Sequence, residues 1–76
     1  MSQPLINKFV VVGIGLIGGS LATGLKQRNA CNEVIGIARK AETCTEAVNH
    51  GVVDRAYTSL QEIAGELGQG DVIFIA

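Results

Sequence analysis

The chain has 76 residues, of which 47% are hydrophobic, and a formal net charge of −1 at pH 7. So many apolar residues exclude a disordered segment and indicate one folded domain with a buried core. A nearly neutral, slightly acidic chain has little attraction for nucleic acid or an anionic membrane, so we expect neither as a main partner.

Neither the N-terminus nor the cysteines point to export or to a metal. The first eight residues, MSQPLINK, lack the basic and apolar regions of a signal peptide, and no apolar run reaches the roughly 20 residues that span a bilayer. Cys31 and Cys44 lack the close spacing of zinc ligands, and we interpret them as reduced thiols. We therefore expect a cytoplasmic protein without a metal site.

The first predicted unit is a strand, a glycine-rich turn and a helix. Residues 8–12 are largely β-branched and aromatic, which predicts a buried strand that ends at Gly13. From Gly15 onward the apolar residues follow helical spacing: Leu16, Ile17, Leu21 and Leu25. The small residues Gly19, Ser20 and Gly24 then form a slim face, which suits close packing on a sheet.

Five further elements are predicted after this helix. They are a strand at 33–38, a helix at 41–48, a short strand at 53–57, a helix at 60–67 and a strand at 71–76. The second helix has an apolar face made by Ala41, Cys44, Ala47 and Val48, and Gly51 stops it. The third begins with a capping box formed by Ser59 and Glu62.

The alternation of strands and helices predicts the fold class. The order β-α-β-α-β-α-β is typical of an α/β protein with a Rossmann-type parallel sheet and helices on both faces. A doubly wound dinucleotide fold usually has six strands, so we expect only its first half in this chain. We expect the strand order 3-2-1-4.

The glycines after the first strand predict a phosphate site. Gly13, Gly15 and Gly18 have the spacing G-x-G-x-x-G, directly after a strand and at the start of a helix. The first allows the tight turn, the second lets a pyrophosphate approach the backbone, and the third lets the helix pack on the sheet. The N–H groups of Leu16 and Ile17 would then point at the phosphate. The alternative is a turn whose glycines serve packing only.

The end of the second strand predicts which dinucleotide binds. An acidic residue normally stands about 20 residues beyond the last glycine and holds the ribose 2′-OH of NAD. In this chain that position, 20 residues after Gly18, is Ala38, and Arg39 and Lys40 follow it. Two cations without a carboxylate suit a 2′-phosphate, so we predict NADP rather than NAD. The alternative is that both cations are only solvated. Ala76, at the end of the last strand, completes the predicted cofactor-binding residues.

The other polar residues give no catalytic candidate. His50 is the only histidine, and it stands at the predicted end of the second helix, where an imidazolium simply favours the helix C-terminus. That position is away from the carboxyl ends of the strands, so we do not assign His50 a catalytic role. We interpret the remaining charged residues as solvated or capping groups: Asp54, Arg55, Glu62 and Glu66.

Four segments of the chain together resemble a known family. They are VVVGIGLIGGSLATGLK, VIGIARK, AVNHGVVDRA and DVIFIA. They are similar to the N-terminal part of the prephenate and arogenate dehydrogenases of tyrosine biosynthesis, over nearly all 76 residues. The resemblance implies that residues 1–76 begin an NAD(P)-binding domain, and that a helical dimerisation and substrate domain follows in the complete protein. Many members carry an Asp at the position of Ala38, and its absence fits the NADP-using branch.

The resemblance also implies an activity. The family oxidatively decarboxylates prephenate or arogenate, and its catalytic groups lie beyond the part that residues 1–76 resemble, so we expect this chain alone to be inactive. Two alternatives stay open: a dinucleotide-sensing module without catalysis, and a Rossmann reductase of another substrate class. The family suggests a homodimer. The sequence ends within the apolar strand 71–76, where a fifth strand should pair. We expect that strand either to be an open edge that self-associates or to be followed by further residues of the protein beyond Ala76.

Overall fold

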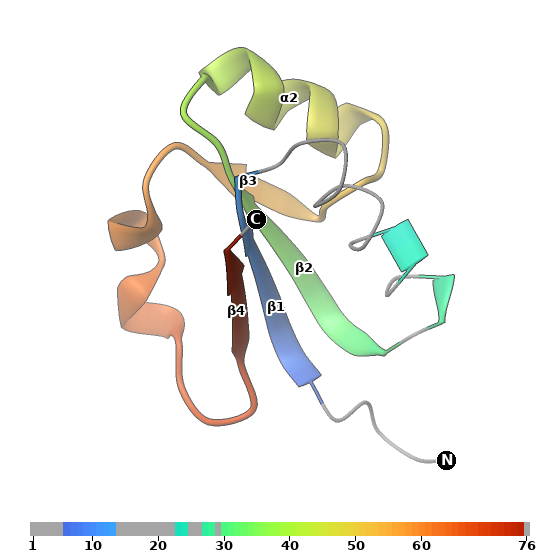
Figure 1. Ribbon diagram of the computed structural model, residues 1–76, viewed down its shortest axis with the longest axis vertical. Coiled ribbons are helices and arrows are strands. Elements are labelled where there is room, and N and C mark those ends of the chain that lie inside the picture. Colours follow the sequence, from blue (N-terminus) through green and yellow to red (C-terminus); the bar gives the residue numbers. More distant parts are fainter. Residues whose placement is uncertain (1–5, 14–22, 25–26, 29, 76) are drawn as a thin grey trace.

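The computed structural model describes residues 6–13, 23–24, 27–28 and 30–75. Its four strands form one parallel sheet in the order β3-β2-β1-β4 (Figure 1). The strands are β1 (Ile6–Val12), β2 (Cys31–Ile37), β3 (Arg55–Tyr57) and β4 (Val72–Ile75). The predicted α/β fold class and the predicted strand order are confirmed.

Two strands start later than predicted because an aspartate stands before each of them. Asp54 accepts the backbone N–H of Val34 at 2.8 Å through its carboxylate, so β3 begins one residue further on. Asp71 likewise accepts the backbone N–H of Lys8 at 3.0 Å, and β4 begins at the next residue. In both cases a side chain takes the place of a backbone acceptor at the start of a strand. β1 and β2 each begin two residues earlier than predicted, because Ile6 pairs in parallel with Cys31.

One face of the sheet packs against helix α2 (Ala41–Asn49). Phe9, Val11 and Val34 are buried there with Ala47 of the helix, and the ring of Phe74 stacks on that of Phe9 with centroids 6.3 Å apart. Cys44 and Ala47 are the buried residues of α2. Ala41 and Val48 are exposed, so the buried stripe of the helix is narrower than predicted.

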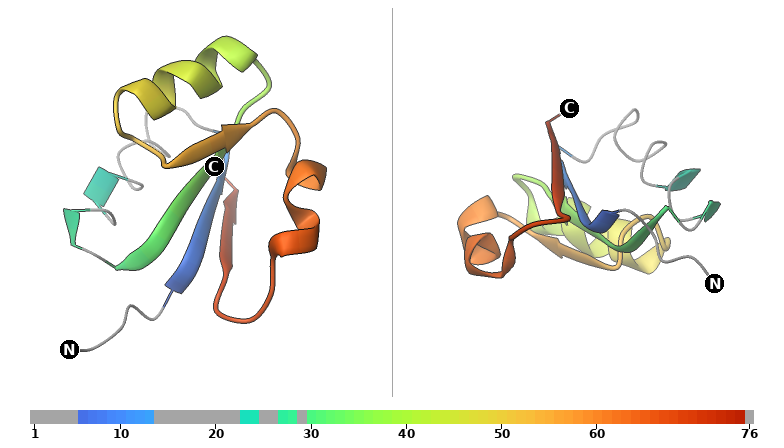
Figure 2. Two further views of the ribbon diagram at one scale, coloured as in Figure 1. Left: turned by 180° about the vertical axis from the view of Figure 1, so that it is seen from behind. Right: turned by 90° about the horizontal axis from the view of Figure 1, so that it is seen from below.

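The opposite face packs against the connection between β3 and β4. Val10, Ile35 and Ile37 are buried there around Ile63, which has no exposed surface. Because successive strand residues point to opposite faces, the apolar runs of β1 and β2 supply both cores at once. Seen from behind in Figure 2, α2 lies along β3, whereas the β3–β4 connection leads down to the start of β4.

The predicted third helix is wrong in type. Residues 60–67 form two short 3-10 helices, η1 (Leu60–Glu62) and η2 (Ala64–Glu66). Ile63 separates them with φ −117° and ψ 1°, a conformation that turns its side chain into the core instead of continuing a helix. Gly65 further lowers the helical preference of this stretch.

The predicted capping box is confirmed at the start of η1. Ser59 Oγ accepts the backbone N–H of Gln61 at 3.2 Å, and the carboxylate of Glu62 accepts the backbone N–H of Ser59 at 3.3 Å. The predicted helix after Gly15 lies mostly outside the described residues. Within it, the N–H of Arg28 donates to the carbonyl oxygen of Gly24 at 3.1 Å. No helix in the described part of the chain is long and apolar enough to cross a membrane.

Candidate functional site

A cavity of about 240 Å³ lies at the carboxyl ends of the strands. Its lining comes from the last residues of β1, β2 and β4 and from the residues that follow β1, β2 and β3: Val12, Gly13, Ile37, Ala38, Arg39, Thr58 and Ile75. From β1 the sheet continues through β2 to β3 on one side, whereas β4 pairs with the other side of β1. The cavity therefore lies at the topological switch point, the position at which open α/β sheets bind ligands.

The turn after β1 has the conformation predicted for it. Gly13 has φ 88°, a value that favours glycine, and its N–H donates to the carbonyl oxygen of Ile37 at 2.8 Å. This bond ties the end of β1 to the end of β2 and leaves Gly13 exposed at the cavity. Four other predicted phosphate-binding residues lie outside the described residues, and their roles stay predictions: Gly15, Leu16, Ile17 and Gly18.

The residues after β2 reach the cavity unequally. The N–H of Ala38 donates to the carbonyl oxygen of Tyr57 at 3.0 Å, which holds this residue at the end of the sheet with 8% of its surface exposed. Arg39 is exposed, lines the cavity and makes no ion pair with another described residue. Lys40 is the N-cap of α2 and is not among the cavity's lining residues. The structure thus brings Gly13, Ala38 and Arg39 together, and it leaves Lys40 outside the lining.

Thr58 and Ile75 also line the cavity, and the sequence reasoning did not single them out. Thr58 directly follows β3, as Ala38 follows β2, so its position after the predicted strand at 53–57 was the available signal. Its backbone N–H donates to the carboxylate of Glu62 at 3.2 Å. The predicted site residue Ala76 lies outside the described residues.

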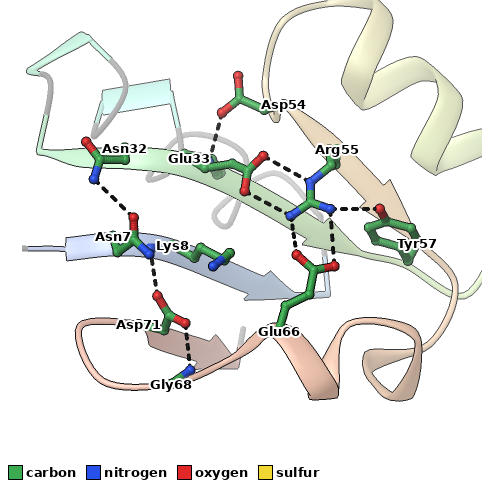
Figure 3. Close-up of polar contacts among 11 residues, drawn as sticks. Asn7, Lys8, Asn32, Glu33, Asp54, Arg55, Tyr57, Glu66, Gly68 and Asp71 are labelled. Atoms are coloured by element: carbon green, nitrogen blue, oxygen red, sulfur yellow. Dashed lines mark hydrogen bonds and ion pairs between the residues drawn. The ribbon is translucent and has the colours of Figure 1, made fainter.

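Arg55 forms a polar cluster with residues of β2, β3 and η2 (Figure 3). Its guanidinium donates to Glu33 at 3.0 and 2.9 Å and to Glu66 at 3.3 and 2.8 Å, and it also donates to the hydroxyl of Tyr57 at 3.1 Å. The prediction that Arg55 and Glu66 are solvated or capping groups is therefore wrong, because they form an ion pair with each other. Their common role is to fasten η2 to the sheet.

The charges of the cluster reinforce one another. The hydrogen bonds to Glu66 and Glu33 raise the pKa of Arg55, and the bond from Arg55 lowers the pKa of Glu66. Because its donors already bind two carboxylates, Arg55 has little capacity left for a ligand. Arg39 is different, since no described carboxylate pairs with it and it is the one charged residue among the described residues of the cavity lining.

His50 and the two cysteines lie outside the cavity lining. His50 is the exposed C-cap of α2. Arg39 lies before the other end of this helix, whose nine residues span a length of about 13 Å. Cys31 and Cys44 are buried, and Cys44 Sγ donates to the carbonyl oxygen of Tyr57 at 3.2 Å. Among the residues that the structure describes, no three metal-ligating side chains come together. The predicted cytoplasmic location and the predicted reduced state of the thiols stay predictions.

Comparison with known proteins identifies the fold of this chain by its similarity to solved structures. No protein-family model matches the chain, and no curated protein matches its sequence. It is similar to the crystal structure of prephenate dehydrogenase from Aquifex aeolicus in complex with hydroxyphenyl propionate and NAD+, with a TM-score of 0.80 and 24% identity over 92% of this chain. A second crystal structure of prephenate dehydrogenase from Aquifex aeolicus matches with a TM-score of 0.67 and 29% identity over 72% of this chain.

These likenesses confirm a prephenate dehydrogenase-like fold. The chain spans only 24% and 20% of the two solved chains that it matches. The activity, substrates and partners of a whole enzyme therefore do not follow from the likeness of fold.

Proposed function

We propose that this chain is the cofactor-binding part of an NADP-dependent prephenate or arogenate dehydrogenase, which carries out an oxidative decarboxylation in tyrosine biosynthesis. The observation that carries the proposal is the cavity at the switch point, where the Gly13 turn and Arg39 line one space. The likeness of fold to prephenate dehydrogenase supports the same assignment. In the complete protein, prephenate or arogenate is the proposed substrate and a homodimer the proposed assembly.

The cavity residues fit a dinucleotide by their chemistry. Gly13 has a left-handed backbone with φ 88°, which gives the tight turn that precedes the pyrophosphate site in this type of fold. Arg39 can offer two parallel N–H donors to a phosphate, and the described part of the lining holds no acidic residue to repel one. When bound, the nicotinamide supplies the hydride acceptor of the oxidation. The described residues of this chain act at the opposite, adenosine end of the cofactor.

The preference for NADP rests on this chain's own residues, since the similar Aquifex aeolicus enzyme is in complex with NAD+. A carboxylate at position 38 would accept bonds from the ribose hydroxyls of NAD and repel a 2′-phosphate. Ala38 removes that repulsion, and Arg39 supplies a cation beside it. Lys40 adds positive charge from outside the lining and has a smaller proposed effect.

Calorimetric titration with NADPH and with NADH tests the proposal. We expect Arg39→Ala to weaken NADPH binding roughly 10-fold, as for loss of one charge-assisted hydrogen bond at an exposed site, and to leave NADH binding unchanged. Ala38→Asp should improve NADH relative to NADPH. Arg28→Ala is the matched control, because Arg28 is also exposed and is outside the cavity lining. Tighter NADH than NADPH binding by the unaltered chain would refute the NADP assignment.

The same cavity supports a proposal about catalysis. Its described lining contains no His, Asp or Glu, so no general base for the substrate hydroxyl is present there. We therefore expect no reduction of NADP by this chain with prephenate or arogenate. Turnover above the blank would overturn that expectation. In the longer polypeptide that carries this chain, turnover of either substrate would distinguish a dehydrogenase from a sensing module and from another reductase.

A further inference from the structure

Thr58 lies beside Ala38 at the carboxyl end of the sheet. In the parallel register Tyr57 of β3 pairs with Ile37 of β2, so the residues that follow, Thr58 and Ala38, are lateral neighbours. The bond from the N–H of Ala38 to the carbonyl oxygen of Tyr57 holds this register up to the ends of both strands. Neighbouring strands lie about 4.8 Å apart, so Thr58 stands one strand spacing from position 38.

The hydrogen-bonding groups of Thr58 are divided between the fold and the cavity. Its backbone N–H donates to the carboxylate of Glu62 at 3.2 Å, and the N–H of Ser59 donates to the same carboxylate at 3.3 Å. Thr58 is exposed and lines the cavity, and its hydroxyl makes no hydrogen bond to another described residue. Glu62 therefore fixes the backbone of Thr58, and the hydroxyl is the donor that this residue can offer to a ligand.

Position 38 itself offers no polar side chain. In dinucleotide folds a carboxylate at this position holds the ribose 2′-OH, and here the residue is Ala38. On the side of β1, the register places Gly13 beside it, and glycine has no side chain. On the side of β3 the neighbour is Thr58. Of the two residues that flank position 38 in the sheet, only Thr58 carries a group that can bind the substituent on the ribose.

We infer that the hydroxyl of Thr58 donates a hydrogen bond to the 2′-phosphate of NADP and, together with Arg39, sets the preference for this cofactor. The inference rests on the proposed function and adds a specificity-determining residue to the same site. It separates two contributions to one contact, because Arg39 follows β2 and Thr58 follows β3. The two residues therefore approach the cavity from adjacent strand ends.

The chemistry of the hydroxyl favours the phosphate over the ribose 2′-OH. A hydrogen bond to a charged acceptor is roughly twice as strong as one between neutral groups, so the same hydroxyl contributes more to NADP than to NAD. The carboxylate of Glu62 opposes this effect little, because Glu62 is outside the cavity lining and two backbone N–H groups already bind its carboxylate.

Calorimetric titration with adenosine 2′,5′-bisphosphate and with AMP tests the inference, since the two probes differ only in the 2′-phosphate. We expect Thr58→Val to weaken binding of the bisphosphate roughly 5-fold, as for one hydrogen bond at an exposed site, and to leave AMP binding unchanged. Thr58→Ser keeps the hydroxyl and should bind the bisphosphate like the unaltered chain. Thr45→Val is the matched control, because Thr45 is also exposed and is outside the lining of this cavity. Circular dichroism verifies that the variants keep the fold.

The outcomes separate this inference from the proposed function. Suppose that the unaltered chain prefers the bisphosphate and that Arg39→Ala weakens its binding, whereas Thr58→Val does not: the NADP assignment then stands and the role of Thr58 is refuted. Equal losses of both probes in Thr58→Val would mean that the hydroxyl contacts another part of the adenosine, and would also overturn the inference. If the unaltered chain binds AMP as tightly as the bisphosphate, both the NADP assignment and the inference fail.

Discussion

The two ends of the sheet use their polar groups differently. At the amino end, Asp54 and Asp71 each accept a backbone N–H from the neighbouring strand, and the side-chain amide of Asn32 donates to Asn7. At the carboxyl end, the cavity lining includes Arg39, which has no carboxylate partner among the described residues. Bonds within the protein satisfy the first set, whereas the guanidinium of Arg39 binds no described carboxylate.

This difference shows why charge alone does not identify a binding residue. Arg55 and Arg39 are both arginines at the sheet's surface, one at the start of a strand and one shortly after a strand ends. Arg55 is bound by Glu33 and Glu66, and only 32% of its side chain is exposed. Its position between two acidic side chains makes it a structural group. Arg39 follows the end of β2 and faces no described acid.

Substitution of two glycines with positive φ, one at each end of the sheet, should give the largest difference in effect on stability and NADPH binding. Gly13 has φ 88° at the cavity, and Gly51 has φ 73° at the far end of α2, with no atom within 4 Å of an added Cβ. We expect Gly13→Ala and Gly51→Ala each to cost about 1–2 kcal/mol of stability, because a left-handed backbone disfavours a side chain. Only Gly13→Ala should also weaken NADPH binding. Urea denaturation and calorimetry measure the two effects, and equal loss of binding in both variants would contradict the assignment of the cavity.

Removal of Arg55 should have a smaller effect, and on stability only. Arg55→Ala breaks the bonds that hold η2 and leaves Glu33 and Glu66 near each other without a cation. We expect a loss of at most about 1 kcal/mol in the free energy of unfolding, since the pair is bidentate but partly exposed. NADPH affinity should stay within error of the unaltered chain. A marked fall in affinity with unchanged stability would mean that Arg55, and not Arg39, binds the cofactor.

A fall in pH should have the smallest effect on stability, and that effect should come from Asp71 at the amino end of the sheet. Bonds from the N–H groups of Gly68 and Lys8 lower the pKa of Asp71 from its ordinary value of 3.8. A group with a lowered pKa in the folded state stabilises the protein above its unfolded pKa, and that contribution is lost as pH falls through the folded pKa. Asp71→Asn should therefore flatten the fall of stability below about pH 4, as followed by thermal denaturation. An unchanged pH profile in Asp71→Asn would show that this carboxylate does not contribute.

The fold was largely predictable because its strands are continuous apolar runs. Val10 and Val11 of β1 are both fully buried, one on each face, which only a sheet with two covered faces allows. The sequence did not predict the break at Ile63, since the spacing of Leu60, Ile63 and Leu67 also suits an α-helix. Tertiary packing decided that segment, because Ile63 is buried between Val10 and the residues of β2.

The candidate site was predictable where a residue directly follows an evident strand. Gly13 was found in this way, whereas Ala38 was found from its spacing of 20 residues after Gly18, and both line the cavity. Thr58 was missed because β3 has only three residues and gives a weak sequence signal. The difference between Arg39 and Lys40 could not be predicted, since it depends on how the chain turns from β2 into α2.

The position of β1 between β2 and β4 has a consequence for the rate of folding. The bond between the N–H of Lys8 and Asp71 joins residues 63 positions apart, which is nearly the whole chain. β1 can pair with β2 after closure of a much shorter loop, whereas its pairing with β4 must await the closure of this long one. Assembly should therefore proceed outward from β1 and β2, with β4 docking last. Its apolar edge would then stay uncovered throughout the slowest step, when encounters between chains compete with folding.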